Sequence, residues 1–181
     1  MKNFFEVDSF PDFIMGQDMF LQMHHAEDDN HIAEVVNMVN RNQKDFSTYL
    51  DLRHYTNIDS AKRVISKREQ LAKQGLLVDY AIQLFTGKTI GCISFTNRGD
   101  GSVGVTYYID KQFRGMGFIS KSLNLAEPEM AKLGFKEIVL EINETNENSI
   151  RVANKNGYAF NETGFCMKDF IKKLSNINNE H

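Results

Sequence analysis

Gly115 and Gly117 lie in the stretch QFRGMGFISKSL, between an extended apolar run and a long amphipathic run. Glycine has no Cβ, so a backbone that carries it can approach a charged ligand closely. The first amides of a helix have no partner inside the helix, and the helix dipole favours negative charge beside them. The spacing therefore predicts either a phosphate-binding loop at a helix N-terminus or a tight turn alone.

Two motifs narrow the chemistry of this loop. The sequence contains no GxxxxGK[ST], and GMGFIS does not complete GxGxxG. This argues against nucleoside triphosphates and nicotinamide dinucleotides. The pattern that fits is Q/R-x-x-G-x-G/A, formed by Gln112, Gly115 and Gly117. A second stretch, NENSIRVANKNGY, begins at Asn146 and follows the pattern N-x-x-S-x-R-V-x-x-K-x-G-[FY].

Together these motifs resemble those of the GNAT superfamily of acyl-coenzyme A-dependent N-acetyltransferases. The second motif is similar to the branch typified by the ribosomal-protein N-terminal acetyltransferases, the RimJ/RimL type. Upstream, DMFLQMHHAEDDNHIAEVV and VDYAIQLFTGKTIGCISF resemble the opening strand and helix and the central hairpin of that branch. The resemblance covers Asp18 to about Gly164, with both motifs in the expected order and at the expected separation.

The resemblance implies transfer of an acetyl group from acetyl-coenzyme A to a primary amine, at a protein N-terminus or on a small molecule. The amine would attack directly within a ternary complex, with no covalent enzyme intermediate. Coenzyme binding is assigned by resemblance to the end of one strand, to the glycine loop and to the second motif. These residues are Tyr107, Ile109, Gln112, Phe113, Arg114, Gly115, Met116, Gly117, Asn146 and Ser149.

Ser149 is the candidate catalytic residue, because the resemblance makes it the group that protonates or hydrogen-bonds the departing thiolate. Asn146 is expected to cap a helix, which puts Ser149 in the first turn beside amides that favour negative charge. Alternatively, the Ser149 hydroxyl only completes the cap. Relatives often carry a glutamate as an aid to proton removal where this sequence has Gly104. The general base therefore stays open between an acceptor of low pKa and a base elsewhere, such as His54 or Glu141.

The acceptor cleft is predicted in the polar stretch RNQKDFSTYLDLRHYTN, where this family shapes its acceptor site. Asp51 and His54 are the candidate cleft residues, and plain loop polarity is the other interpretation of each. The competing functional hypothesis is a catalytically inactive acyl-coenzyme A-binding sensor or partner module. Gly104 favours that hypothesis and Ser149 opposes it.

Composition limits the partners. The chain has 181 residues, a formal net charge of -3 and a pI of about 6.0, so it lacks the basic footprint of a nucleic-acid-binding protein. No apolar run resembles a signal peptide or a membrane span. These features predict a cytoplasmic monomer or homodimer without nucleic-acid or membrane partners. No metal is predicted, because His24 and His25 are adjacent in an expected strand and point to opposite faces, as surface or turn histidines. Cys92 and Cys166 are expected as buried thiols without metal-type spacing.

Hydrophobic periodicity predicts the scaffold that positions these residues. Strands are expected at 19–24, 78–85, 89–95, 103–110 and 137–143, with one or two edge strands in 158–174. Helices are expected from AEDDNH onward, from Asp59 or Ser60 to Gln74, at 119–133 and at 147–156. Pro128 is expected to kink or break the third of these helices.

The predicted fold class follows from the order of these elements. It is a mixed α/β (α+β) fold with a mostly antiparallel central sheet, flanked by helices and splayed at the cofactor site. A single domain is expected at 18–174, between an N-terminal extension at 1–17 and a frayed tail at 175–181.

Overall fold

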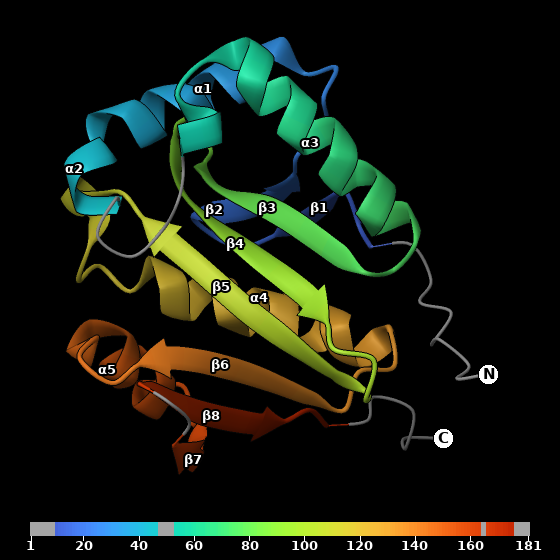
Figure 1. Ribbon diagram of the computed structural model, residues 1–181, viewed down its shortest axis with the longest axis vertical. Coiled ribbons are helices and arrows are strands. Elements are labelled where there is room, and N and C mark those ends of the chain that lie inside the picture. Colours follow the sequence, from blue (N-terminus) through green and yellow to red (C-terminus); the bar gives the residue numbers. More distant parts are fainter. Residues whose placement is uncertain (1–9, 47–52, 164–165, 176–181) are drawn as a thin grey trace.

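The computed structural model describes residues 10–46, 53–163 and 166–175. Within this part, an eight-stranded sheet has the order β1-β2-β3-β4-β5-β6-β8-β7, and every neighbouring pair is antiparallel except β5 and β6 (Figure 1). The strands are β1 Phe13–Met15, β2 Met19–Met23, β3 Leu77–Leu84, β4 Thr89–Asn97, β5 Ser102–Ile109, β6 Glu137–Asn143, β7 Ala159–Thr163 and β8 Met167–Lys173. The predicted fold class is confirmed.

Helices cover both faces of the sheet. The α-helices are α1 Asp29–Arg41, α2 Gln43–Phe46, α3 Ile58–Lys73, α4 Phe118–Lys132 and α5 Glu147–Lys155, with 3-10 turns η1 Arg53–Tyr55 and η2 Lys111–Phe113. In Figure 1, α1 and α3 lie in front of the sheet and α4 lies behind it. The strand, helix and strand order predicted around the glycine loop is present as β5, α4 and β6.

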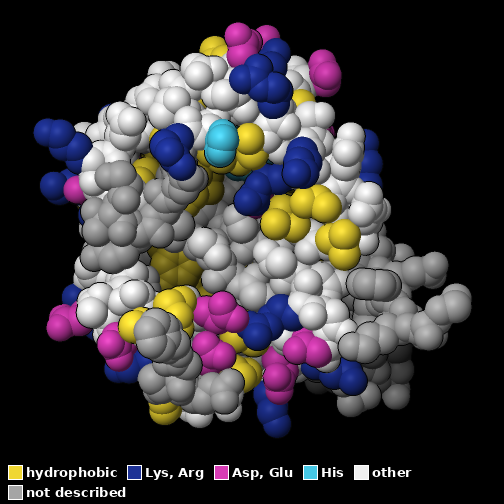
Figure 2. Space-filling view, in the orientation of Figure 1, with side chains coloured by type: hydrophobic (Ala, Val, Ile, Leu, Met, Phe, Trp, Pro, Cys, Tyr) yellow, Lys and Arg dark blue, Asp and Glu magenta, His cyan; other side chains and the backbone are white. Residues whose placement is uncertain are grey.

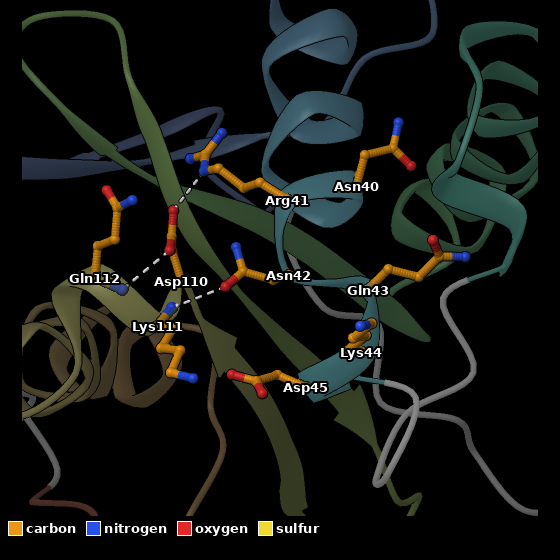
Figure 3. Close-up of a pocket in the computed structure, with 9 residues that line it drawn as sticks. All are labelled: Asn40, Arg41, Asn42, Gln43, Lys44, Asp45, Asp110, Lys111 and Gln112. Carbon is orange, nitrogen blue, oxygen red and sulfur yellow. Dashed lines mark hydrogen bonds and ion pairs between the residues drawn. The ribbon is translucent and has the colours of Figure 1, made fainter.

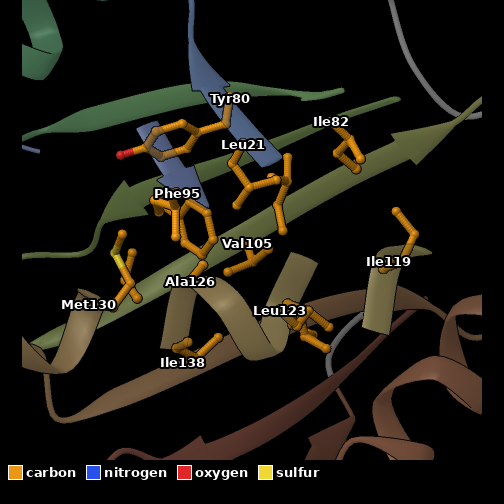
Figure 4. Packing of buried hydrophobic residues seen from close by; sticks show 14 of the residues in the cluster. Leu21, Tyr80, Ile82, Phe95, Val105, Ile119, Leu123, Ala126, Met130 and Ile138 are labelled. Atoms are coloured by element: carbon orange, nitrogen blue, oxygen red, sulfur yellow. The ribbon is translucent and has the colours of Figure 1, made fainter. Parts of the chain in front are cut away.

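The α4 face of the sheet holds the larger core. Leu123, Ala126 and Met130 are fully buried on α4 and belong to one cluster with Phe95 and Val105 of the sheet (Figure 4). Truncating a leucine in such a position to alanine costs about 2–5 kcal/mol in proteins generally. This packing therefore fixes α4, and with it the loop that precedes α4, against the sheet.

The opposite face carries α1 and α3 on a second cluster. Ile32, Val35, Val36 and Val39, the predicted inward stripe of α1, are all buried there. Ala81 from β3 and Cys92 from β4 complete the cluster. Because α1 and α3 contact the part of the sheet built by β3 and β4, they lie on the side of β5 that is away from β6.

One local prediction is wrong, and one of the two alternatives predicted at Pro128 is excluded. The cap of α3 is Asn57, not Asp59 or Ser60, because the Asn57 side chain accepts a hydrogen bond from the Ser60 amide at 2.9 Å. Pro128 does not break α4, which runs continuously to Lys132. Asn124, whose carbonyl loses its helical donor at Pro128, is exposed, so water can satisfy that carbonyl while the buried face keeps its packing.

Two elements were not predicted. β1 pairs with β2, and Phe10 and Ile14 are buried in the core beside it, so the sheet begins before Asp18. The short helix α2 lies in the stretch expected to be irregular. The closing segment forms two strands, in agreement with the one or two that were expected, but only β7 is at the edge, because β8 lies between β6 and β7.

β5 and β6 separate along their length. Their parallel pairing joins Ser102, Val103 and Gly104 to the stretch Glu137–Val139 and then stops. Beyond it, β5 stays paired with β4 as far as Ile109, and β6 stays paired with β8 as far as Asn143. The sheet therefore splits into two halves between β5 and β6, and the predicted splay is present (Figure 1).

Candidate active site

Backbone amides of β5 face the split. The Asp110 amide donates to the Ile90 carbonyl at 2.7 Å, and in an antiparallel pair the residues that bond across to one neighbour alternate along the strand. Tyr108 and Asp110 therefore bond toward β4. Tyr107 and Ile109 have their amides on the other side, where β6 has moved away. Tyr107 and Ile109 are two of the residues that the resemblance assigned to coenzyme binding.

The glycine loop leads directly into α4. Gly115 and Gly117 have φ of 76° and 82°, in the left-handed region that side chains other than glycine rarely adopt. No atom lies within 4 Å of where a Cβ would stand on either residue. Gly117 is the N-cap of α4 and provides no side-chain hydrogen bond, so the first amides of α4 remain open to a ligand. The loop is both a tight turn and an uncovered helix N-terminus.

The start of the loop is fixed to α1. Arg41 Nε lies 2.6 Å from Asp110 Oδ2, and the Asn42 side chain accepts from the Lys111 amide at 2.9 Å. Asp110 also accepts from the Gln112 amide at 3.1 Å. Burial alone would raise the pKa of Asp110, but the hydrogen bonds from Arg41 and Gln112 outweigh it and hold that pKa below its ordinary value. The carboxylate therefore stays charged and anchors the loop at neutral pH.

A pocket lies between this anchor and α2 (Figure 3). Its volume is about 500 Å³. It is lined by Asn40, Arg41, Asn42, Gln43, Lys44, Asp45, Asp110, Lys111 and Gln112. The pocket includes Gln112 of the predicted coenzyme loop but not Ser149, Gly115 or Gly117. It is therefore a separate pocket next to the split.

The side chains of Phe113, Arg114 and Met116 have different environments in the loop. Arg114 Nη1 is 3.1 Å from Asp45 Oδ2, so a phosphate would compete with a carboxylate for this guanidinium. Phe113 packs edge to face on Phe118, which holds the turn onto α4. Met116 is 61% exposed, so only its backbone belongs to the folded loop.

Asn146 caps α5, as predicted: its side chain accepts from the Ser149 amide at 3.2 Å. This puts Ser149 in the first turn of α5, just after β6 and on the far side of the split from β5. Tyr107 Oη is buried without a hydrogen bond of good geometry, and this burial raises the pKa of the phenol. Tyr107 on β5 and Ser149 at the start of α5 thus lie on the two sides of the split.

The strand position where relatives have glutamate is covered by an arginine. A Cβ on Gly104 would meet Arg98 Cδ at 3.7 Å, and Arg98 Nη1 lies 2.6 Å from Glu141 Oε1. Glu141 is two residues beyond Val139, the register partner of Gly104, so it is on the same sheet face and closer to the split. A carboxylate is therefore present beside the vacant position, supplied by the next strand.

The predicted acceptor residues are only partly described. His54 is exposed in η1, and Asp51 lies outside the described residues. Phe46 packs edge to face on Tyr108 at 5.0 Å between ring centroids, which brings the end of α2 next to β5. The space-filling view has a hollow in this face near the end of β5 (Figure 2), where an acceptor could approach the split.

Two expectations about other side chains are wrong. His24 is buried, with Nδ1 2.7 Å from His31 Nε2, because α1 provides a partner that the local sequence could not reveal. Burial lowers the pKa of both rings, that of His31 to about 4, so both are neutral. Cys92 is a buried thiol, as expected, but Cys166 is exposed.

The described part of the chain has no candidate metal site and no candidate membrane span. No three His, Cys, Asp or Glu residues in 10–46, 53–163 and 166–175 are arranged to hold a metal ion. None of the helices in the same ranges is long and apolar enough to cross a membrane.

Sequence reasoning missed the residues that anchor the loop. The contact between Arg41 and Asp110 joins positions 69 residues apart, and no local pattern marks Arg41 or Asn42. Asp110 had a weak signal, since an aspartate that follows a strand often caps the turn that comes next. Arg98 had none, because its position over Gly104 depends on the geometry of the turn between β4 and β5.

Comparison with known families defines the class of protein. Residues 20–159 match the family model described as the acetyltransferase (GNAT) domain. The chain therefore belongs to the GNAT acetyltransferase family, and the resemblance inferred from the motifs is confirmed. Comparison with curated protein sequences gave no match.

Solved structures share the fold over nearly the full chain. RimL, a ribosomal L7/L12 alpha-N-protein acetyltransferase in complex with coenzyme A, has a TM-score of 0.79 at 17% identity, covering 93% of this chain and 99% of its own. A ribosomal-protein-S5-alanine acetyltransferase from Vibrio fischeri has 0.77 at 16%, covering 93% and 99%. The microcin C7 self immunity acetyltransferase MccE, in complex with acetyl-CoA and AMP, has 0.77 at 16%, covering 88% and 94%.

Proposed function

We propose that this acetyltransferase moves the acetyl group of acetyl-coenzyme A to a primary amine by direct attack in a ternary complex. The observation that carries the proposal is the split between β5 and β6, bordered by the free amides of Tyr107 and Ile109 and ending at the uncovered loop of Gly115 and Gly117. An extended thioester with a pyrophosphate at its far end fits a groove with donors along one side and a helix N-terminus at its end.

Each part of the split has one task in this scheme. The amides of the glycine loop and of the first turn of α4 would hold the pyrophosphate. The amides of Tyr107 and Ile109 would polarise the thioester carbonyl and stabilise the oxyanion that develops on it. The amine nitrogen attacks the carbonyl carbon, the carbon–sulfur bond breaks, and Ser149 donates a hydrogen bond to the departing thiolate.

Glu141 is the better candidate for the general base. It lies on the acceptor-facing side of β6 next to the position of Gly104, and Arg98 holds its carboxylate at 2.6 Å. His54 is exposed on η1, where it is better placed to contact the acceptor than to act as the base. A base matters most for a lysine-type amine, whose deprotonation at pH 7 costs about 4.6 kcal/mol, while an α-amine is roughly one-tenth neutral.

The acceptor is proposed to be a protein N-terminus or a small amine. The fold neighbours support both, because RimL acts on ribosomal protein L7/L12 and MccE is a self immunity acetyltransferase solved with AMP. A low-pKa α-amine fits best with the exposed, ion-paired state of Glu141, since such an amine is partly neutral at pH 7 and needs little help from a base. The proposal further includes a single domain that ends near residue 174 and begins before Asp18, because β1 belongs to its sheet. It also includes a cytoplasmic location, a monomer or homodimer, and no metal, nucleic-acid or membrane partner.

The test is release of free thiol from acetyl-coenzyme A with a panel of peptides, polyamines and small amines, combined with calorimetric binding of coenzyme A. Thiol release that depends on one acceptor class is the expected result. Coenzyme binding without thiol release on any acceptor contradicts the proposal and favours the inactive sensor, for which the loss of the strand glutamate at Gly104 is the specific observation. His54→Ala is expected to change acceptor turnover and leave coenzyme binding unchanged.

A further inference from the structure

The pocket beside the split has no task in the scheme above. Its volume is about 500 Å³, and it lies between the end of α1, the helix α2 and the turn η2 (Figure 3). The helix α1 covers the face of the sheet opposite to α4, whereas the proposed pyrophosphate site is built from the glycine loop and the first turn of α4. Neither Gly115 nor Gly117 lines the pocket. The pocket is therefore on the acceptor side of the split.

Hydrogen bonds hold the walls of this pocket in place. The buried Asn42 side chain accepts from the Lys111 amide at 2.9 Å. Arg41 is bound to the Asp110 carboxylate and also donates to the Thr89 carbonyl at 2.9 Å. The backbone of Lys111 is thus fixed at one wall before any ligand arrives. A preformed wall lowers the entropy cost of binding a ligand.

Both carboxylates of the pocket are already compensated by arginines. Arg41 Nε lies 2.6 Å from Asp110 Oδ2. Arg114 Nη1 lies 3.1 Å from Asp45 Oδ2, an ion pair without hydrogen-bond geometry. Lys111 differs from these residues, because within the described residues its ammonium makes neither an ion pair nor a hydrogen bond. An ammonium has three donors and no acceptor, so Lys111 can bind an anion in the pocket.

The lining as a whole also favours an anion. It contains three positively charged side chains and two negatively charged ones, and the third positive charge is that of Lys44 on α2. The chain as a whole has a formal net charge of -3, and the acceptor-facing side of β6 carries Glu137 and Glu141. A concave site of one sign raises the local concentration of ligands of the opposite sign. The pocket is therefore a positive site on an acidic protein.

The pocket is close to where the amine would react. Phe46, at the end of α2, packs edge to face on Tyr108 with 5.0 Å between ring centroids, so α2 is next to β5. Lys111 follows Ile109 by two residues, which span at most about 7 Å. An acceptor whose amine attacks beside the Ile109 amide therefore has room to place a second polar group near Lys111.

We propose that this pocket selects acceptors that carry an oxyanion, a carboxylate or a phosphate, close to the reacting amine, and that Lys111 binds this oxyanion. The proposal rests on the proposed acetyl transfer to an amine in the split. Two sources share the chemistry: an acidic side chain near a peptide N-terminus, and a small amine that bears a carboxylate or phosphate. The oxyanion accepts charge-assisted hydrogen bonds from the Lys111 ammonium while the amine faces the thioester.

The first test measures binding and needs no turnover. Calorimetry compares two matched pairs of ligands on the protein saturated with coenzyme A: four-residue peptides with Glu or Gln at the second position, and phosphoethanolamine against ethanolamine. At least one anionic ligand is expected to bind about 3- to 10-fold more tightly than its neutral counterpart at low salt. The pair that shows the preference identifies the source. At about 1 M salt the preference is expected to shrink, because screening weakens the attraction between exposed charges.

The second test changes the charge of Lys111, whose amide keeps its bond to Asn42 in any variant. Lys111→Gln is expected to remove the preference for the anionic ligand and to leave coenzyme A affinity unchanged. Lys136→Gln is the matched control, since Lys136 is exposed just before β6, at the end where β5 and β6 are paired, and it makes the same change in total charge. Lys111→Glu is expected to reverse the preference, so that a peptide with Lys at the second position binds better than the Glu peptide.

Three results would overturn the anion site. In the first, both anionic ligands bind no better than their neutral counterparts. In the second, the preference survives Lys111→Gln. In the third, Lys111→Gln weakens coenzyme A binding without changing acceptor preference, which assigns the pocket to a coenzyme phosphate. A failure of the proposed function looks different: the protein shows the Lys111-dependent preference and yet releases no thiol with any amine. A protein that binds neither coenzyme A nor any of these ligands contradicts both proposals.

Discussion

At the Ser102 end of β5, three residues pair with β6, whereas at the Ile109 end the two strands are no longer paired. The closed end contributes Val103 and Ile138, both fully buried, and holds the halves of the sheet together. The open end contributes backbone amides without a strand partner, the glycine loop and Ser149. The two strands therefore stabilise the sheet at the Ser102 end, where they are paired. At the Ile109 end they are unpaired and form the candidate site.

The strongest test of this contrast changes one carboxylate at each end of β6. Glu141→Gln, at the open end, is expected to lower turnover on a lysine-type amine about 100-fold and on an α-amine much less, since only the former must lose a firmly held proton. Glu137→Gln, on the same face at the closed end, is the matched control. Steady-state kinetics with both acceptor types measure the difference, and equal effects of the two variants would remove Glu141 from the chemistry.

A smaller effect is expected at the serine of the open end. Ser149→Ala should lower turnover about 10- to 100-fold with little change in coenzyme affinity, because a thiol of pKa near 8.5 needs modest help to leave. Ser60 is the control, as the Asn57 cap of α3 takes its amide at 2.9 Å in the same arrangement. If Ser149→Ala behaves like Ser60→Ala, with turnover intact where chemistry limits the rate, Ser149 is a capping residue only.

The glycine loop is compared with the turn at Gly87, where the glycine has the same φ as Gly117. Gly117 and Gly87 both have φ of 82° and no atom within 4 Å of a Cβ position, so alanine at either should cost about 1 to 2 kcal/mol of stability. Only Gly117→Ala is expected to weaken coenzyme binding, about tenfold, because its Cβ enters the proposed phosphate site. Equal coenzyme affinity of the two variants in calorimetry would make the loop a turn and nothing more. Gly115→Val is expected to behave like Gly117→Ala, with a larger loss of affinity.

The smallest effect concerns the loop anchor and depends on pH. The pKa of Asp110 is depressed in the folded protein, so its contribution to stability is present above the unfolded pKa of about 3.9 and is lost as pH falls through the folded value. Asp110→Asn should therefore lower stability by about 1 to 2 kcal/mol at pH 7. The difference from wild type should shrink below about pH 4 in thermal melts. A difference that does not change with pH would separate the anchor from the charge of Asp110.

The sequence by itself determined the elements whose signals are local. The stripe of Ile32, Val35, Val36 and Val39 gave α1, and glycine spacing placed the loop before α4. The Asn146 cap was also predicted, because capping depends on residues three apart. The family followed from two motifs within 50 residues of each other, whose order and separation the chain itself carries.

The tertiary structure alone decided what these elements meet. Arg41 reaches Asp110, Arg98 covers Gly104 and His31 pairs with His24, and in each case the partners are distant in sequence or on different elements. The α4 helix crosses Pro128 because burial of its inner face outweighs one lost hydrogen bond. The site is the gap where β5 and β6 stop pairing. Strand pairing depends on two segments at once, so neither segment alone specifies where the pairing ends.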